Sequence, residues 1–484
     1  MSPGYSPGTL NVSGNVAFQT GSIYRAEVQA SGVNDLISVG GSVLIDPGST
    51  VQVVGSRGSY ANYRTFTILT AENGVTGRFA SADVNFAFLA PVLSYGWNYV
   101  DMTLVRNNIP FAAEAYTFNE RSTARGTESL QAGNAVYDAV ASQLKGEAFA
   151  AFDALSGEIY ASAASVMQQQ SAYARDAVGA RLRQSFGSGT PAALAYASGA
   201  PQTAGFGRDL AMVMWVQGFG GWGNTFSDGN AASISNSIGG AMGGVDAALG
   251  ENWRVGAYGG FSQSWFSVPD RSSSGSMDNY DLGLYAGAQF GAAALRLGGG
   301  YAWHDVSVSR TVAFPGYAGV NTSGYTAGTA QMFGELAYDV SLNGIAFEPF
   351  AGLAYLHLDG GSATEIGSSS ALMVDGGSMD TLYSTLGIRG ATTLTLGGQT
   401  FAPNFTLGWQ HAFGDTAPQA MMTYVAGSSP FPILGAPIAA DALAVGVGIA
   451  YAISPQAKLS VNYDGTIATT AAQNAVVGQL QVRF

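Results

Sequence analysis

Side chains that could perform catalysis are few and widely separated in this sequence. The three histidines are His304, His357 and His411, and there is no cysteine. A Gly-Asp-Ser-Leu motif is absent, as are His-x-Glu and phosphate-loop spacings. Without cysteine the chain has no disulfide and no thiolate metal ligand. We therefore expect no enzymatic activity, no cofactor and no metal site.

Charged side chains in the second half of the chain are placed to line a polar interior. Arg254, for example, stands between Trp253 and Val255. Because successive residues of a strand face opposite sides, such charges share one face and the apolar residues share the other. The charged set on that face comprises Arg254, Asp281, Arg296, Glu335, Glu348 and Arg389. We expect these side chains to contact whatever fills the interior; simple hydration of an open pore is the alternative.

The composition of the chain indicates what the apolar face would meet. Only 11% of the 484 residues are charged and 67 are glycine, whereas soluble domains average about 25% charged residues and about 7% glycine. No segment has the roughly 20 consecutive apolar residues of a membrane helix. A membrane β-barrel, in which alternate residues face lipid, fits this composition better. The net charge of −13 argues against nucleic acid as a partner.

Twelve candidate strands follow one another between residues 211 and 484, and their connections alternate between short and long. The long connections are 226–234, 269–277, 309–324, 361–377, 415–437 and 466–472. Bacterial outer-membrane barrels have an even number of antiparallel strands, with short turns in the periplasm and long loops outside. We predict a 12-stranded antiparallel transmembrane β-barrel over residues 209–484.

Residues 111–208 are predicted to form a helical connector. Within it, residues 156–186 are rich in Ala, Ser, Gln and Arg and have no broad apolar stripe, which suits a narrow polar tunnel better than an ordinary core. Twelve strands should leave room for roughly one helix of about 10–12 Å diameter. We predict a pore-threading α-helix whose Arg175, Arg181 and Arg183 meet the charged wall. An exposed linker helix is the alternative.

Residues 1–110 contain short β-type runs separated by tight Gly, Asn and Asp turns, for example 23–28, 36–39 and 50–54. Runs of this length suit the stacked rungs of a solenoid, and we predict the end of a β-helix. A small β-sandwich is the alternative.

Several segments resemble those of monomeric autotransporters of type Va secretion. Residues 63–71 and 74–79 resemble the autochaperone region at the end of the passenger, and residues 155–160 and 175–183 resemble the linker helix. In the barrel, residues 215–222 (Trp-Val-Gln-Gly-Phe-Gly-Gly-Trp) resemble the first strand, and residues 435–442 resemble the stretch that enters the tenth strand. The combination covers nearly the whole chain. The resemblance implies that the β-helix is right-handed and that Tyr63, Phe66 and Phe79 belong to an autochaperone-like region.

The resemblance also implies a function in protein export. The chain would be an outer-membrane translocator that anchors its own N-terminal passenger and exports it to the cell surface through a helix-plugged barrel. Its partners would be outer-membrane lipid, the barrel-assembly machinery, periplasmic chaperones and the passenger, and the protein would be a monomer. A surface adhesin whose solenoid is the active part, or a passive porin-like channel, are the alternatives.

Two further expectations concern the chain end and the linker helix. The last strand places Leu480, Val482 and Phe484 on one face, and in the family such an aromatic end is the signal read by the assembly machinery; a merely lipid-facing Phe484 is the alternative. Family members that cleave themselves inside the barrel do so beside an Asn of the linker helix. Residues 156–186 contain no Asn, so we expect no cleavage there.

Overall fold

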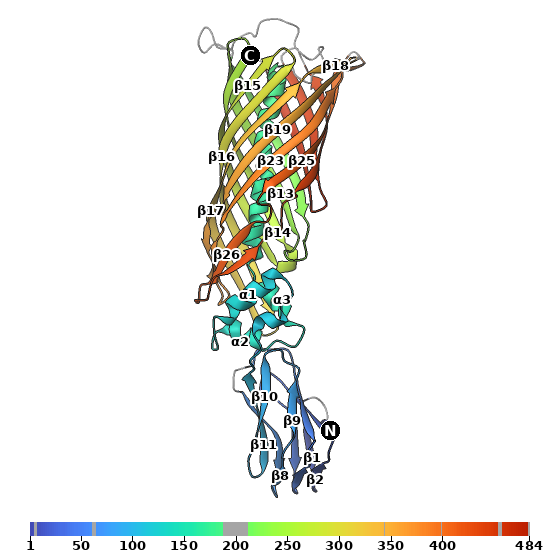
Figure 1. The fold of residues 1–484 in the computed structure, drawn as a ribbon, viewed down its shortest axis with the longest axis vertical. Coiled ribbons are helices and arrows are strands. Elements are labelled where there is room, and N and C mark those ends of the chain that lie inside the picture. The colour runs from blue at the N-terminus through green and yellow to red at the C-terminus, as the bar shows by residue number, and fades with distance from the viewer. Residues whose placement is uncertain are drawn as a thin grey trace.

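The computed structural model describes all residues except 4–6, 61–63, 187–211, 343, 398, 454–456 and 483–484. A stack of short strands, a group of helices and a β-barrel follow one another along one long axis (Figure 1). None of the described helices is both long and apolar enough to cross a membrane.

The N-terminal stack is built from three successive turns of chain, each of which adds one strand to each of three parallel sheets. The turns contain β1 (Thr9–Val12), β2 (Val16–Phe18) and β3 (Ile23–Val28); β4 (Leu36–Val39), β5 (Val43–Ile45) and β6 (Thr50–Gly55); and β7 (Thr65–Ala71), β8 (Val75–Gly77) and β9 (Ser81–Val84). A solenoid requires this parallel pairing; the right-handed β-helix itself stays a prediction. Phe66 and Phe79 are buried in the core of the stack, and Tyr63 lies outside the described residues.

A hairpin and a group of short helices connect the stack to the barrel. Strands β10 (Leu89–Tyr95) and β11 (Tyr99–Arg106) pair with each other, and β11 pairs antiparallel to β7. The helices are η1 (Phe111–Glu114), α1 (Phe118–Glu128), α2 (Ala135–Ala141) and α3 (Ala148–Leu155). Thr117 and Glu120 form a capping box that begins α1. The helical group lies on the mouth of the barrel (Figure 1).

Within the described residues, twelve antiparallel strands close into a barrel, because the last strand pairs with the first. They are β12 (Met212–Thr225), β13 (Ile234–Leu249), β14 (Trp253–Val268), β15 (Ser273–Phe290), β16 (Ala293–Phe314), β17 (Tyr317–Tyr338), β19 (Ile345–Asp359), β23 (Ser378–Ala391), β25 (Gln399–Gly414), β28 (Asp441–Ala452), β29 (Ala457–Ile467) and β30 (Ala471–Val482). The predicted barrel is thereby confirmed. We call the end with the connections at 250–252 and 291–292 the turn end and the opposite end the loop end.

Side chains of the barrel strands separate into an exposed apolar face and a buried inner face. Outward-facing Leu284 and Met332 are each 70% exposed, whereas Tyr258 faces inward and is 2% exposed. Outward-facing aromatic residues mark two levels: Trp253, Phe290 and Tyr338 toward the turn end, and Phe261, Tyr280 and Trp303 toward the loop end. An apolar band between two aromatic girdles is the surface of a barrel that spans a membrane.

The expectation of long loops at 269–277 and 309–324 was wrong. Strand β15 begins at Ser273, and β16 and β17 continue to a turn at residues 315–316. The extended part of β16 turns Val306, Val308 and Val312 inward, where they join a core that also contains Phe152 of α3. Polar, Gly-rich sequence thus forms strands here because one face is buried against the helices.

The predicted loops 361–377 and 415–437, at the loop end, also contain strands, and these strands pack against the helical group. Strands β20 (Ser362–Thr364), β22 (Leu372–Asp375), β26 (Gln419–Tyr424) and β27 (Phe431–Leu434) form one sheet. The buried ring of Phe431 packs against the backbone of Gly126 in α1, where a larger side chain would collide with it.

The substitution Phe431→Ala should loosen α1 from the barrel mouth. Removing a buried Phe side chain costs about 3–5 kcal/mol, so amide hydrogen exchange in residues 118–128 should become at least about 100-fold faster. Phe431→Leu, which keeps most of the apolar volume, should have a much smaller effect. Unchanged exchange in Phe431→Ala would show that this contact does not hold α1.

Candidate functional site in the barrel lumen

Helical chain runs along the inside of the barrel (Figure 1), and it is divided into two helices. They are α4 (Glu158–Gln170) and α5 (Ala172–Phe186), separated by Ser171. Every residue from Glu158 to Gln168 is buried, although α4 has no broad apolar stripe. The barrel with its internal helix is therefore confirmed, and the helix is not an exposed linker.

Small side chains on α4 allow the barrel loops to approach it closely. The Ser165 hydroxyl donates to the carbonyl of Ala436 at 2.5 Å, and the Ala436 amide donates to the Ser162 hydroxyl at 3.0 Å. A Cβ atom at Gly435 would lie only 2.5 Å from the backbone of Ala161. The Ala/Ser composition of the helix and the glycine at 435 are thus both consequences of this close contact.

The loop end of α4 is held by two buried carboxylates. Glu158 accepts hydrogen bonds from the Ala232 amide at 2.6 Å and from Asn119 of α1 at 3.3 Å. Glu365 binds Arg310 through two hydrogen bonds of 3.0 and 2.8 Å and accepts a third, also 3.0 Å long, from the Tyr160 hydroxyl. These contacts join the helix to three loop-end segments of the barrel.

Helix α5 packs one side against the wall formed by β12 to β15. Val178 and Leu182 are fully buried against this wall, whose inward side chains include Trp215 and Tyr285. Tyr173 stacks on Phe219 with 4.7 Å between the ring centroids. This wall therefore supplies the apolar contacts of the helix.

A buried ion pair ties α5 to the same wall. Arg181 donates to both carboxylate oxygens of Asp246, at 2.6 and 2.9 Å, and the two side chains are 1% and 0% exposed. Arg254 also contacts this carboxylate. Tyr285 donates to Asp246 at 2.8 Å and accepts from Trp215 at the same distance. Of the helix arginines expected to meet the charged wall, Arg181 has a direct charged partner, and this partner, Asp246, was not among the predicted wall residues.

Four of the expected wall charges pair with one another instead. Arg296 binds Glu335 at 2.6 Å and Glu348 at 2.5 Å, and Arg389 binds the same two carboxylates at 2.6 and 2.9 Å. Arg296 lies opposite Glu335 in the pairing of β16 with β17, and Glu348 lies opposite Arg389 in that of β19 with β23. We call these four residues the charge square. The register of the strands brings them together, and their ion pairs connect neighbouring strands of the wall that faces α5.

The remaining expected residues have separate positions. Arg175 donates to Ser171 at 2.8 Å and to Gln331 at 3.0 Å, while Arg183 lines a polar cavity of about 450 Å³ beside α5. Asp281 lies on β15, and its side chain has no hydrogen bond or ion pair with the described residues. Leu480 and Val482 lie within β30, and Phe484 lies outside the described residues.

The polar cavity shows that α5 does not fill the lumen evenly. Its wall opposite the apolar contacts carries amide side chains, including Asn404, Gln410 and Asn462. By contrast, α4 is buried over its whole length up to Gln168. Helix α4 is therefore closely packed on all sides inside the barrel, whereas the lumen around α5 is wider.

The three histidines do not come together. His304 bonds with Asn279 at 2.7 Å and Thr329 at 2.9 Å within the barrel wall, whereas His357 and His411 lie on the outside, paired with Asp380 and Asp441. Within the described part of the chain, no three His, Asp or Glu side chains are arranged to hold a metal ion.

Comparison with known proteins identifies the family. The model of the autotransporter β-domain matches residues 214–464. The chain belongs to the autotransporter β-domain family. Autotransporter β-domains are outer-membrane barrels, so the two aromatic levels of this autotransporter barrel mark the outer membrane.

The curated relatives extend beyond this chain. It is 30% identical over 534 residues to an extracellular serine protease of Serratia marcescens, covering 100% of this chain and 50% of the relative. A second extracellular serine protease of the same organism is 29% identical over 527 residues, covering 99% of this chain and 49% of the relative. This autotransporter chain thus spans about half the length of the curated relatives it matches.

Solved autotransporter barrels are also similar to it. The translocator domain of NalP from Neisseria meningitidis gives a TM-score of 0.46 at 16% identity, covering 65% of this chain and 98% of that one. The β-domain of the Bordetella autotransporter BrkA gives 0.43 at 17% identity, covering 56% and 99%.

The substitution Asp246→Asn should release α5 from the wall. It leaves Arg181 and Arg254 together without a carboxylate, and breaking a buried ion pair costs about 3–5 kcal/mol. Hydrogen exchange in residues 177–186 should therefore become at least about 100-fold faster. Asp281→Asn is the matched control, because Asp281 also lies on an inner wall and should leave the exchange unchanged. Equal effects of the two variants would contradict the role given to the pair.

Proposed function

We propose that this chain is a translocator unit that anchors its own N-terminal passenger in the outer membrane and exports it to the cell surface. The observation that carries the proposal is the path of the chain. It runs from the stack through α1, α2 and α3 into the lumen, and α4 and α5 follow the lumen toward the turn end. If an N-terminal passenger is exported through the barrel, the segment that connects it to the barrel remains in the lumen. The chain has this arrangement, because it lies inside its own barrel and has folded structure beyond the loop end.

The proposal divides the chain into a passenger end at residues 1–110, a helical connector at 111–208 and a barrel at 209–484. Residues 1–110 would lie on the cell surface, where folding around Phe66 and Phe79 would draw more passenger outward. Lumen residues such as Arg181 and Arg254 would retain the helix after export. The barrel would act as a monomer.

Assembly of the barrel would depend on other components of the cell envelope. We propose that periplasmic chaperones deliver the unfolded chain and that the barrel-assembly machinery reads the end of the last strand, at Leu480, Val482 and Phe484. Apolar side chains at alternate positions of a strand would suit recognition by strand pairing.

We propose that the chain contributes export and not catalysis. The matched relatives are named extracellular serine proteases, and about half of each lies outside the match. A secreted hydrolase is therefore the passenger class we favour. A passive porin is disfavoured because α4 fills the lumen from Glu158 to Gln168.

Surface display tests the proposed function. A signal peptide and an epitope tag are fused before residue 1, and the protein is expressed in a Gram-negative host. Antibody and added protease should reach the tag on intact cells. Phe484→Ala is predicted to lower the amount of assembled barrel, measured by its heat-dependent shift in gel mobility. A correctly assembled barrel whose tag stays inaccessible on intact cells would refute the proposal.

Cleavage inside the barrel is not expected, because residues 156–186 have no Asn. The purified, refolded protein should keep its intact mass during prolonged incubation at neutral pH. A cut between residues 156 and 186, located by mass spectrometry, would overturn this prediction.

A further inference from the structure

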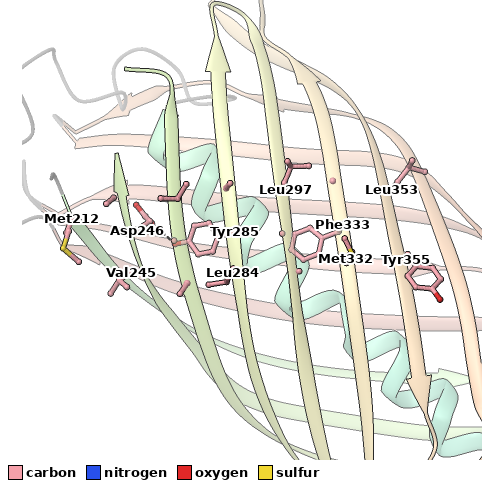
Figure 2. Close-up of a pocket in the computed structure, with 18 of the residues that line it drawn as sticks. Met212, Val245, Asp246, Leu284, Tyr285, Leu297, Met332, Phe333, Leu353 and Tyr355 are labelled. Carbon is pink, nitrogen blue, oxygen red and sulfur yellow. Dashed lines mark hydrogen bonds between the residues drawn. The ribbon is translucent and has the colours of Figure 1, made fainter. Parts of the chain in front are cut away.

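A broad apolar groove crosses the outer surface of the barrel. Its volume is about 920 Å³, and its lining comes from consecutive strands between β12 and β23 (Figure 2). On β14 the lining residues Val255 and Ala257 lie between Trp253 and Phe261 in sequence, and on β15 Leu284 lies between the aromatic residues of the two girdles. The groove therefore lies within the band that faces the hydrocarbon of the membrane.

Two glycines form the floor of the groove. Gly299 lies opposite Leu284 on one neighbouring strand and opposite Met332 on the other. Gly334 lies in the same way between Leu297 and Leu353. Each glycine is thus flanked on both sides by a long apolar side chain, which leaves a depression in an otherwise continuous apolar surface.

The polar side chains that line the groove are already hydrogen-bonded. The Tyr355 hydroxyl donates to Asp380 on the outer surface at 2.6 Å, and the other two are engaged inside the barrel. Asp246 and Tyr285 contribute to the lining, but the Asp246 carboxylate binds Arg181 and Arg254, and the Tyr285 hydroxyl donates to Asp246. No free donor or acceptor of these two side chains is directed at the groove. Its ligand must therefore be apolar along the part that is held.

We propose that this groove binds the acyl chain of a membrane lipid in a fixed position. The groove is continuous with the lipid-facing surface, so the surrounding phase supplies acyl chains directly. Apolar burial offers no advantage within hydrocarbon, because lipid tails are as apolar as leucine. Selective retention must come from close contact along the walls, and the depression between Leu284, Leu297, Met332 and Leu353 supplies that contact.

Native mass spectrometry tests the site directly. The full chain is reconstituted in nanodiscs of phosphatidylethanolamine and phosphatidylglycerol, then released by stepwise activation. The wild-type barrel should retain a single phospholipid at energies that strip all others. The double variant Gly299→Leu/Gly334→Leu should fill the groove, and retention should fall at least tenfold.

The variants place leucine at outward-facing glycines that can accept a larger side chain. A Cβ at Gly334 would meet the flexible end of Leu297 at 3.0 Å, and one at Gly299 would lie 3.2 Å from the Gln331 carbonyl, so both sites need only small adjustments. Gly239→Leu is the control, because Gly239 lies on β13 outside the groove and has open space at its Cβ position. Its lipid retention should equal that of the wild type.

Three outcomes would overturn the proposal: no retained lipid on the wild type, equal retention by the double variant, or equal loss in Gly239→Leu. A wild-type dimer that the double variant abolishes would instead assign the groove to contact between two copies. A heat-dependent gel shift establishes that each variant forms the barrel. The result is independent of surface display, since lipid can bind whether or not a passenger is exported.

Discussion

The fit between helix α4 and the inside of a twelve-stranded barrel is the constraint on which the rest of the structure depends. A helix with large side chains all round would not pass between walls at this spacing, whereas Ser162 and Ser165 let loop backbone come within hydrogen-bonding distance of α4. The same constraint explains Gly435, where any Cβ would meet the helix backbone. The small side chains of the helix, the glycine in the loop and the number of strands therefore depend on one another, because together they set the space between helix and wall.

Buried charge has two separate uses in the lumen. The pair between Arg181 and Asp246 joins the helix to the wall, while the charge square of Arg296, Glu335, Glu348 and Arg389 joins neighbouring strands. Buried ion pairs add little net stability over apolar packing, yet removing one partner is costly. Such pairs suit a plug that must be held in one position without a broad apolar contact.

Much of the fold could be predicted from the sequence, because alternation and turn residues act locally. Alternation along the strand correctly placed Trp253 on the outer face and Arg254 on the inner face. The small side chains of residues 156–186 correctly indicated a helix inside the barrel. Partner choice could not be predicted, since it depends on register: Glu335 is matched to Arg296 only once β16 and β17 are aligned. Asp246 has the inner parity of β13 and could have been selected, whereas Arg310 and Glu365 were assigned to loops that fold as strands or pack on helices.

Single-channel conductance tests the central claim, that the helix in the lumen closes the barrel. The full chain and a chain lacking residues 156–186 are compared in planar bilayers, after both show the heat-dependent gel shift of a folded barrel. The full chain should conduct little, and the deletion should open a large, stable conductance, because α4 is buried along its length to Gln168. Equal conductance from the two folded proteins would contradict the account.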